Sequence, residues 1–178
     1  ASFRYVIEQS GIEITPEEFD EDYQATLLSL IDSDRLQPMP GLLPLLDDLA
    51  GRDFVLGVAS NSTREHVRLA TVRIGIAERF ACMVSAEEVA RGKPAPDVNL
   101  EAASRLGIAP ACCLAFEDSP SGVRAEQGAG MYCVFVPNPD LTITSFENVD
   151  GVFPSLSACH ASLDEVLRRA ARADGRCA

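Results

Sequence analysis

The chain lacks an apolar run of about 18 residues, the length that a membrane-spanning helix needs, so we expect no transmembrane segment. Its first residues do not combine a basic stretch with an apolar one, so we expect no secretory signal. Basic residues are scarce, 15 against 27 acidic ones, for a net charge of −12. Nucleic-acid binding depends on lysine and arginine neutralising phosphates, so this balance argues against a nucleic-acid partner.

The cysteines show no metal-binding pattern. None forms a C-x-x-C pair, and no histidine lies at metal-ligand spacing, which argues against a zinc site. Most lie in or beside apolar, strand-like runs, where a free cysteine behaves as a small buried hydrophobe. We therefore predict reduced thiols and a cytoplasmic location. The cysteines are Cys82, Cys112, Cys113, Cys133, Cys159 and Cys177.

The length and composition predict one domain, or one domain with a small appendage. The chain has 178 residues, of which 47% are hydrophobic, enough for a substantial core. Pro38 and Pro40-Gly41 interrupt the pattern and divide residues 1–37 from residues 38–178. The absence of an initial methionine suggests that the sequence starts within a longer protein. The sequence leaves the oligomeric state open, a monomer included.

Residues 38–178 alternate between strand-like and helix-like segments. This alternation predicts an α/β fold, with an open parallel sheet between two layers of helices in the Rossmann-like manner. Ligands of such sheets bind at the carboxyl ends of the strands. The expected strands are 54–59, 82–84, 112–116 and 132–136, and the expected helices are 3–9, 16–31, 42–49, 64–74, 97–106, 122–129 and 163–173. Residues 137–154 have little periodicity and carry no assignment.

The single lysine of the chain, Lys93, lies between Gly92 and Pro94, just before a predicted helix. An isolated lysine is most often a solvated surface residue. Its uniqueness, and the Lys-x-x-Pro-Asp run that it opens, favour instead a point charge that binds an anion.

Polar residues also follow two of the predicted strands. Glu117-Asp118 comes directly after one strand, and adjacent carboxylates repel each other unless a cation lies near them. They could equally complement the amino end of the next helix. Ser60-Asn61-Ser62-Thr63 ends another strand ahead of a helix, where a hydroxyl and free amides can bind phosphate. Alternatively, Ser62 or Thr63 only caps the helix.

Together these three segments resemble the haloacid dehalogenase superfamily, in the branch of capped phosphatases and β-phosphoglucomutase-like enzymes. The resemblance covers residues 40–137, with Ser60, Lys93 and the pair Glu117-Asp118 at the second, third and fourth family motifs. It implies that residues 1–37 are the end of a helical cap. The acidic pair favours phosphate chemistry over carbon–halogen chemistry.

The first motif of that family, an Asp-x-Asp after an amino-terminal strand, has no counterpart here. Asp20-Glu21-Asp22 lies inside a predicted helix, and Asp32-Ser33-Asp34 follows a helix and leaves no room for a crossover. We therefore expect that the nucleophile and its strand are missing, and that the chain as given is inactive.

The resemblance implies Mg²⁺-dependent hydrolysis of a small phosphorylated metabolite through an aspartyl-phosphate. Ser60 and Lys93 would be catalytic, Ser60, Asn61 and Lys93 would bind the phosphoryl group, and Glu117 and Asp118 would bind the metal. Two alternatives stay open. One is a sugar-phosphate mutase of the same branch, and the other is a non-catalytic phosphate-binding module that has lost its nucleophile.

Overall fold

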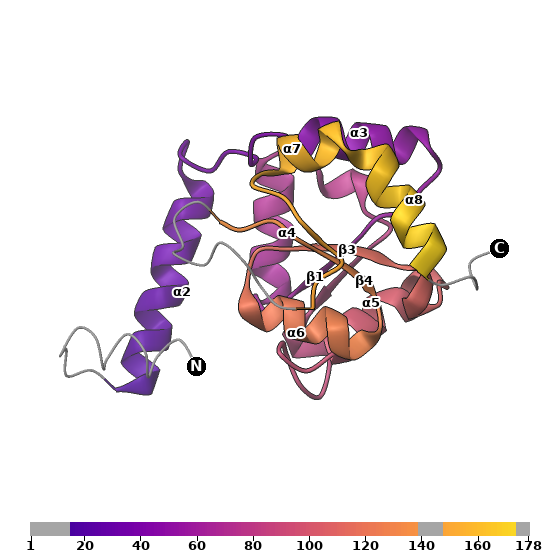
Figure 1. Ribbon diagram of the computed structural model, residues 1–178. Coiled ribbons are helices and arrows are strands. Elements are labelled where there is room, and N and C mark those ends of the chain that lie inside the picture. Colours follow the sequence, from indigo (N-terminus) through magenta and orange to yellow (C-terminus); the bar gives the residue numbers. More distant parts are fainter. Residues whose placement is uncertain (1–14, 139–147, 174–178) are drawn as a thin grey trace. The chain divides into compact units, whose positions relative to one another are not determined.

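The computed structural model describes residues 15–138 and 148–173 (Figure 1). The chain divides into two compact units, Ala1–Gln37 and Pro38–Ala178. The helix predicted at residues 3–9 lies outside the described residues. No helix within the described ranges is both long and apolar enough to cross a membrane.

The described part of the first unit is helix α2, Pro16–Asp32, which confirms the helix predicted there. A capping box begins it: Thr15 Oγ1 accepts from the Glu18 amide, and Glu18 Oε2 accepts from the Thr15 amide. Both Asp-x-Asp segments belong to this region, one inside α2 and one at its end. No strand precedes either segment within the described residues, which agrees with the sequence prediction.

The second unit alternates strands and helices in the predicted order. It contains the strands β1 (Gly57–Ser60), β2 (Cys82–Ser85), β3 (Leu114–Glu117), β4 (Tyr132–Phe135) and β5 (Gly151–Val152). Its helices are α3 (Leu42–Gly51), α4 (Arg64–Arg73), α5 (Asp97–Leu106), α6 (Pro120–Ala129), α7 (Leu156–Ala161) and α8 (Leu163–Ala173). The α/β fold class is therefore confirmed.

The strands form two parallel sheets within the described residues, in keeping with the expectation of a parallel sheet that lacks one strand. β1 pairs with β2 from Gly57–Cys82 to Ser60–Ser85. β3 pairs with β4 from Leu114–Tyr132 to Glu117–Phe135, and β4 pairs with β5. β1 and β3 are not hydrogen-bonded to each other, so each leaves one edge unpaired within the described chain.

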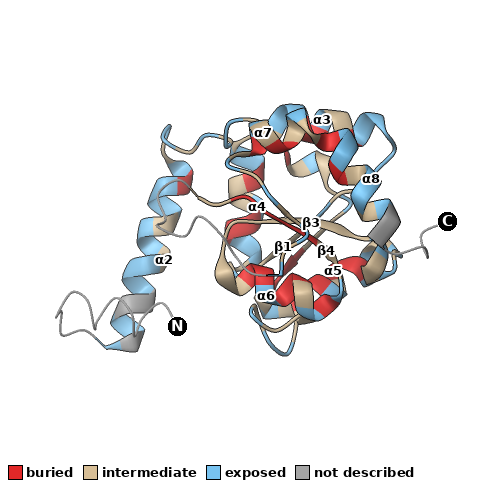
Figure 2. Cartoon of the chain, viewed as in Figure 1, coloured by how far each residue is buried: buried red, intermediate tan, exposed pale blue. Residues whose placement is uncertain are grey.

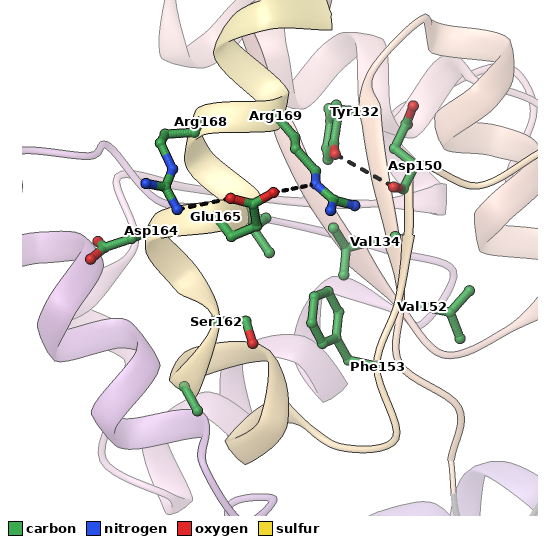
Figure 3. A pocket seen from close by; sticks show the side chains of 13 residues that line it. Tyr132, Val134, Asp150, Val152, Phe153, Ser162, Asp164, Glu165, Arg168 and Arg169 are labelled. Carbon is green, nitrogen blue, oxygen red and sulfur yellow. Dashed lines mark hydrogen bonds and ion pairs between the residues drawn. The ribbon is translucent and has the colours of Figure 1, made fainter.

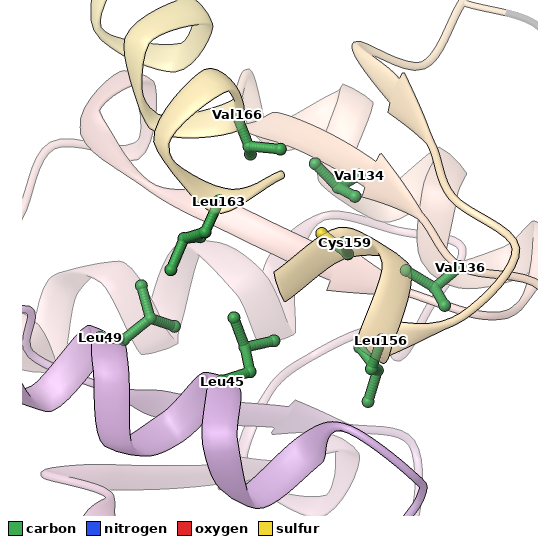
Figure 4. Packing of buried hydrophobic residues seen from close by; sticks show 8 residues of the cluster. All are labelled: Leu45, Leu49, Val134, Val136, Leu156, Cys159, Leu163 and Val166. Atoms are coloured by element: carbon green, nitrogen blue, oxygen red, sulfur yellow. The ribbon is translucent and has the colours of Figure 1, made fainter. Parts of the chain in front are cut away.

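The alternation of side chains along β4 builds the two helical layers around its sheet. Val134 and Val136 belong to the cluster with Leu45 and Leu49 of α3 and with residues of α7 and α8 (Figure 4). Cys133 and Phe135 instead pack with Val123 of α6. Successive residues of a strand point to opposite faces, so one short apolar strand supports both layers. Buried residues accordingly line the inner sides of α3, α5 and α6 (Figure 2).

The β1–β2 sheet is covered in the same way. Val84 packs against Val98 and Ala102 of α5. The neighbouring Met83 receives the Thr71 hydroxyl of α4 at 3.7 Å on its sulfur. α5 also packs against α6, so these two helices form a continuous layer beneath both sheets.

Some element boundaries differ from the sequence prediction. β1 starts three residues later than expected, because Phe54 and Val55 are 44% and 52% exposed and lie outside the strand. β3 starts at Leu114 because Pro110–Cys112 forms a 3₁₀ turn. β5 and α7 were not predicted, since two and six residues are too short for periodicity to reveal.

The cysteine prediction holds in part. Cys82, Cys113, Cys133 and Cys159 are free, and the last two are buried, as expected for small hydrophobes. Cys112, however, is disulfide-bonded, so the prediction of reduced thiols is wrong for that residue.

Helix α6 contains a buried glutamate that the sequence did not reveal. Glu126 is 2% exposed, and its Oε2 has no hydrogen-bond partner. Burial raises the pKa of Glu126 to about 7, assisted by the negative charge of Glu117 and opposed by the Cys133 thiol and Lys93. The folded protein therefore holds the Glu126 proton to a higher pH than the unfolded chain does.

We expect Glu126→Gln to stabilise the fold at alkaline pH. The stability tied to the Glu126 proton is complete below the ordinary pKa of 4.5 and is lost as pH rises through about 7. The gain in the free energy of unfolding from Glu126→Gln should be about 3 kcal/mol at pH 8 and close to zero at pH 4.5. Denaturant unfolding of both proteins across this range measures it. Glu78→Gln, on an exposed side chain, serves as the control. A gain that does not depend on pH would contradict the assignment.

Candidate functional site

The carboxyl ends of β1 and β3 carry the predicted polar residues. Ser60 is the last residue of β1, and its Oγ accepts a hydrogen bond of 3.1 Å from the Ser62 amide. Thr63 caps α4 through the His66 amide. The helix-capping role that the sequence left open for this segment therefore belongs to Thr63, and Ser60 stands at the strand end.

Lys93 reaches the end of β3 and forms an ion pair there. Its Nζ lies 2.6 Å from Glu117 Oε2, and the two side chains are 11% and 9% exposed. Lys93 follows β2 in the chain, so the pair joins segments from different sheets. Such a pair must offset the desolvation of two charges, and removal of either partner leaves the other charge buried and unpaired.

Glu117 uses its second oxygen to hold the start of α6. Oε1 accepts hydrogen bonds from the Asp118 amide at 3.1 Å, the Ser119 amide at 3.3 Å and the Ser119 hydroxyl at 3.0 Å. Burial by itself would raise the pKa of Glu117, but Lys93 and these donors outweigh it and lower that pKa. Both oxygens are thus engaged, and Glu117 serves as the link between Lys93 and α6.

Asp118 has the opposite electrostatic setting. Burial, and next the negative charge of Glu117, raise the pKa of the Asp118 carboxyl. A nearby cation would act against both effects and lower that pKa, so this carboxylate suits a hard cation such as Mg²⁺. Within residues 15–138 and 148–173, no three acidic, histidine or cysteine side chains converge on one point. A metal site that includes Asp118 would therefore need further donors from outside these described residues.

Two residues of this site were missed by the sequence reasoning. Ser119 caps α6 by accepting from the Gly122 amide at 3.1 Å, and the Ser119-Pro120 pair was an available signal for such a cap. Gly122 is buried against Glu117, and a Cβ at that position would overlap the Glu117 carboxyl. No local pattern reveals this requirement, because the contact depends on the turn that follows β3.

Asn61 does not point its side chain toward the acidic pair. Its amide group contacts the backbone of Lys93 on both sides, at 2.7 Å and 2.9 Å. Asn61, Lys93 and Glu117 therefore form a connected chain of contacts, with Ser60 and Asp118 as their sequence neighbours.

A cavity of about 550 Å³ lies away from this site, between the β4–β5 strands and α8 (Figure 3). It is lined by Tyr132, which pairs in register with Leu114 at the opposite end of β3 from Glu117. Its charged groups are largely committed, because Glu165 pairs with Arg168 at 2.8 Å and with Arg169 at 2.7 Å. None of the predicted site residues lines it.

The family relationship follows from a comparison with known proteins. The family model described as haloacid dehalogenase-like hydrolase matches residues 1–136. This match covers most of the chain and includes every residue of the site above. The chain therefore belongs to the haloacid dehalogenase-like hydrolases, which confirms the resemblance.

Individual relatives carry phosphate-related names. The chain is 34% identical over 160 residues to "Probable pseudouridine-5'-phosphatase" of Drosophila melanogaster, covering 86% of this chain and 68% of the relative. It is 37% identical over 117 residues to beta-phosphoglucomutase of Bacillus subtilis, covering 66% and 50%. Among solved structures, CbbY of Rhodobacter sphaeroides in complex with phosphate matches with a TM-score of 0.77 at 23% identity, covering 91% of this chain and 76% of that one. This structural match supports the fold.

Gly122→Ala should destabilise the protein by more than about 2 kcal/mol, because the new methyl group displaces the Glu117 carboxyl from Lys93. The matched control is Gly128→Ala on the same helix, where the added Cβ would meet Pro96 no closer than 3.5 Å. That change should be neutral or stabilise by up to about 1 kcal/mol, since alanine favours helix. Chemical denaturation of both variants measures the difference. Equal effects would show that Gly122 has no special role.

A separate prediction concerns how the Lys93–Glu117 ion pair affects the free energy of unfolding. Lys93→Met and Glu117→Gln should each cost about 3 kcal/mol, because each leaves a buried group without its partner. The double variant should cost clearly less than the sum of the two single variants. Arg168→Met, which breaks a largely exposed pair, should change stability by less than about 1 kcal/mol. Additive costs for Lys93 and Glu117 in the same unfolding assay would contradict the coupling.

Proposed function

We propose that this chain forms most of an Mg²⁺-dependent phosphatase that acts on small phosphate monoesters. The observation that carries the proposal is the buried Lys93–Glu117 pair with Asp118 beside it, at the carboxyl ends of the strands. An ammonium group, together with a carboxylate that could hold a metal ion, lies at one edge of the parallel strands. The positive charges of the ammonium group and the ion would complement a phosphoryl group. The names of the relatives support the same class of substrate.

The proposed roles follow from where each group lies. The Ser60 hydroxyl, at the end of β1, would donate to a phosphoryl oxygen, and the backbone amide of Asn61 would assist. Lys93 would balance the negative charge of the phosphoryl group and its attacking group. Asp118 would hold Mg²⁺ directly, while Glu117, whose oxygens are engaged, would contribute through water. The ion, when bound, supplies positive charge against the phosphoryl oxygens.

The attacking carboxylate is proposed to come from a segment ahead of residue 1. Within residues 15–138 and 148–173, β1 and β3 each leave an edge unpaired, and contacts among Asn61, Lys93 and Glu117 connect their carboxyl ends. A parallel strand between them would place an aspartate at its carboxyl end beside Lys93 and Asp118. That aspartate would take the phosphoryl group and release it to water. Residues 1–37 would then be the end of a cap that helps select the substrate.

Two other functions would leave the same site residues in place. The similarity to beta-phosphoglucomutase favours a mutase, in which the phosphoryl group returns to the sugar and does not pass to water. A binding module without a nucleophile is the second. Release of inorganic phosphate separates the phosphatase from the mutase, and turnover of any kind separates both from the module.

The test is to express the gene with its upstream coding sequence and to assay a panel of phosphate monoesters. We expect phosphate release that needs Mg²⁺ and is lost with EDTA. Asp118→Asn and Lys93→Ala should each lower kcat/KM at least about a hundredfold, the usual scale for charge-stabilising groups. Glu78→Gln, on an exposed side chain away from the site, is the control. Near-normal rates in either site variant would remove the assigned roles.

A further inference from the structure

The side chain of Asn61, the residue after β1, holds the loop that carries Lys93. Asn61 Oδ1 accepts a hydrogen bond of 2.7 Å from the Lys93 amide, and Asn61 Nδ2 donates one of 2.9 Å to the Lys93 carbonyl. Both backbone polar groups of Lys93 are therefore satisfied by the same amide group. Because the Lys93 amide and carbonyl belong to the two peptide groups that flank its Cα, the two hydrogen bonds together restrain both groups.

The neighbouring residue is small enough to permit this approach. A Cβ on Gly92 would lie 2.7 Å from Asn61 Oδ1 and 3.1 Å from the Ala86 methyl group. Only glycine at this position lets the Asn61 side chain lie flat against the Lys93 backbone. The contact with Asn61 thus explains the glycine that precedes Lys93.

The rest of the loop is held from the other side. The Arg91 guanidinium pairs with the Asp97 carboxylate through two contacts of 3.2 Å and 2.9 Å, which close the loop onto the start of α5. The Ala95 amide donates to the Gly92 carbonyl at 3.0 Å. With its backbone restrained by Asn61 and by this turn, Lys93 extends its ammonium to within 2.6 Å of Glu117.

We propose that Asn61 is a positioning residue that sets the place of Lys93 through its backbone, linking the end of β1 to the loop after β2. The role requires the side-chain amide, and so differs from any contribution of the Asn61 backbone to a phosphoryl group. Its catalytic consequence rests on the phosphatase proposed above, whereas its structural consequence concerns this chain alone.

The structural test uses the fact that Lys93 is the only lysine of the chain. An amine-selective acylating reagent, followed by peptide mass spectrometry, reports the exposure of one side chain, with the amino terminus as an internal reference. Lys93 should react slowly in the wild type, because its side chain is 11% exposed and paired. Asn61→Ala should raise that rate about tenfold through the loss of two hydrogen bonds. Arg68→Ala, a change at an exposed residue of α4, should leave the acylation rate of Lys93 unchanged.

A thiol reagent in the same samples separates local loosening from global unfolding. Cys133 is free and fully buried, so its rate of reaction reports the opening of the core. In Asn61→Ala we expect faster acylation of Lys93 and an unchanged rate of Cys133 labelling. An unchanged Lys93 rate, or parallel increases at both residues, would overturn it.

The catalytic test uses the extended, active protein. Asn61→Ala should lower kcat more than it raises KM, and it should have no further effect in a Lys93→Ala background, because it acts through that lysine. Independent, additive losses would overturn the positioning role. If the extended protein turns over no phosphate ester, the phosphatase proposal fails, and the labelling experiment still decides the role of Asn61.

Discussion

The buried ion pair between Lys93 and Glu117 is the contact on which the site depends. The β1–β2 and β3–β5 sheets share no backbone hydrogen bonds, yet this pair joins the loop after one to the end of the other. Glu117 extends the connection into α6 through Ser119, and Asn61 extends it back to β1. Two charges removed from water need good geometry and further hydrogen bonds, and the donors from Asp118 and Ser119 supply these to the Glu117 carboxylate.

The same arrangement divides the polar groups into two kinds. Glu117 and the Asn61 side chain direct their polar atoms to other protein groups and hold the geometry. Asp118 is instead left in a setting that raises its pKa, and no cationic side chain within residues 15–138 and 148–173 forms an ion pair with it. A site that binds an anion beside a cation needs both kinds, because electrostatic stabilisation works best when its charges are fixed in advance.

Much of the fold could be predicted from the sequence. The apolar runs that became β2 and β4, and the glycine that ends α5, were local signals, and the structure follows them closely. The predictions that failed concern residues whose burial differs from what their residue type indicates. Phe54 and Val55 look like strand residues yet lie exposed outside β1, and Glu126 looks like a surface residue yet is buried against Cys133. Hydrophobicity predicts what can be buried, whereas packing determines what is buried.

The sequence by itself determined the α/β order, the identity of the candidate residues and the family, because these rest on periodicity and on short motifs. Only the tertiary structure decided that Glu117 belongs to Lys93 and Ser119, that Gly122 makes room for its carboxyl, and that Asn61 holds the backbone of Lys93. These contacts join residues up to 32 positions apart, and no local pattern encodes which of several polar neighbours a side chain will meet. That choice is made by the crossover geometry of the strands and by the free-energy cost of leaving a buried polar group without a partner.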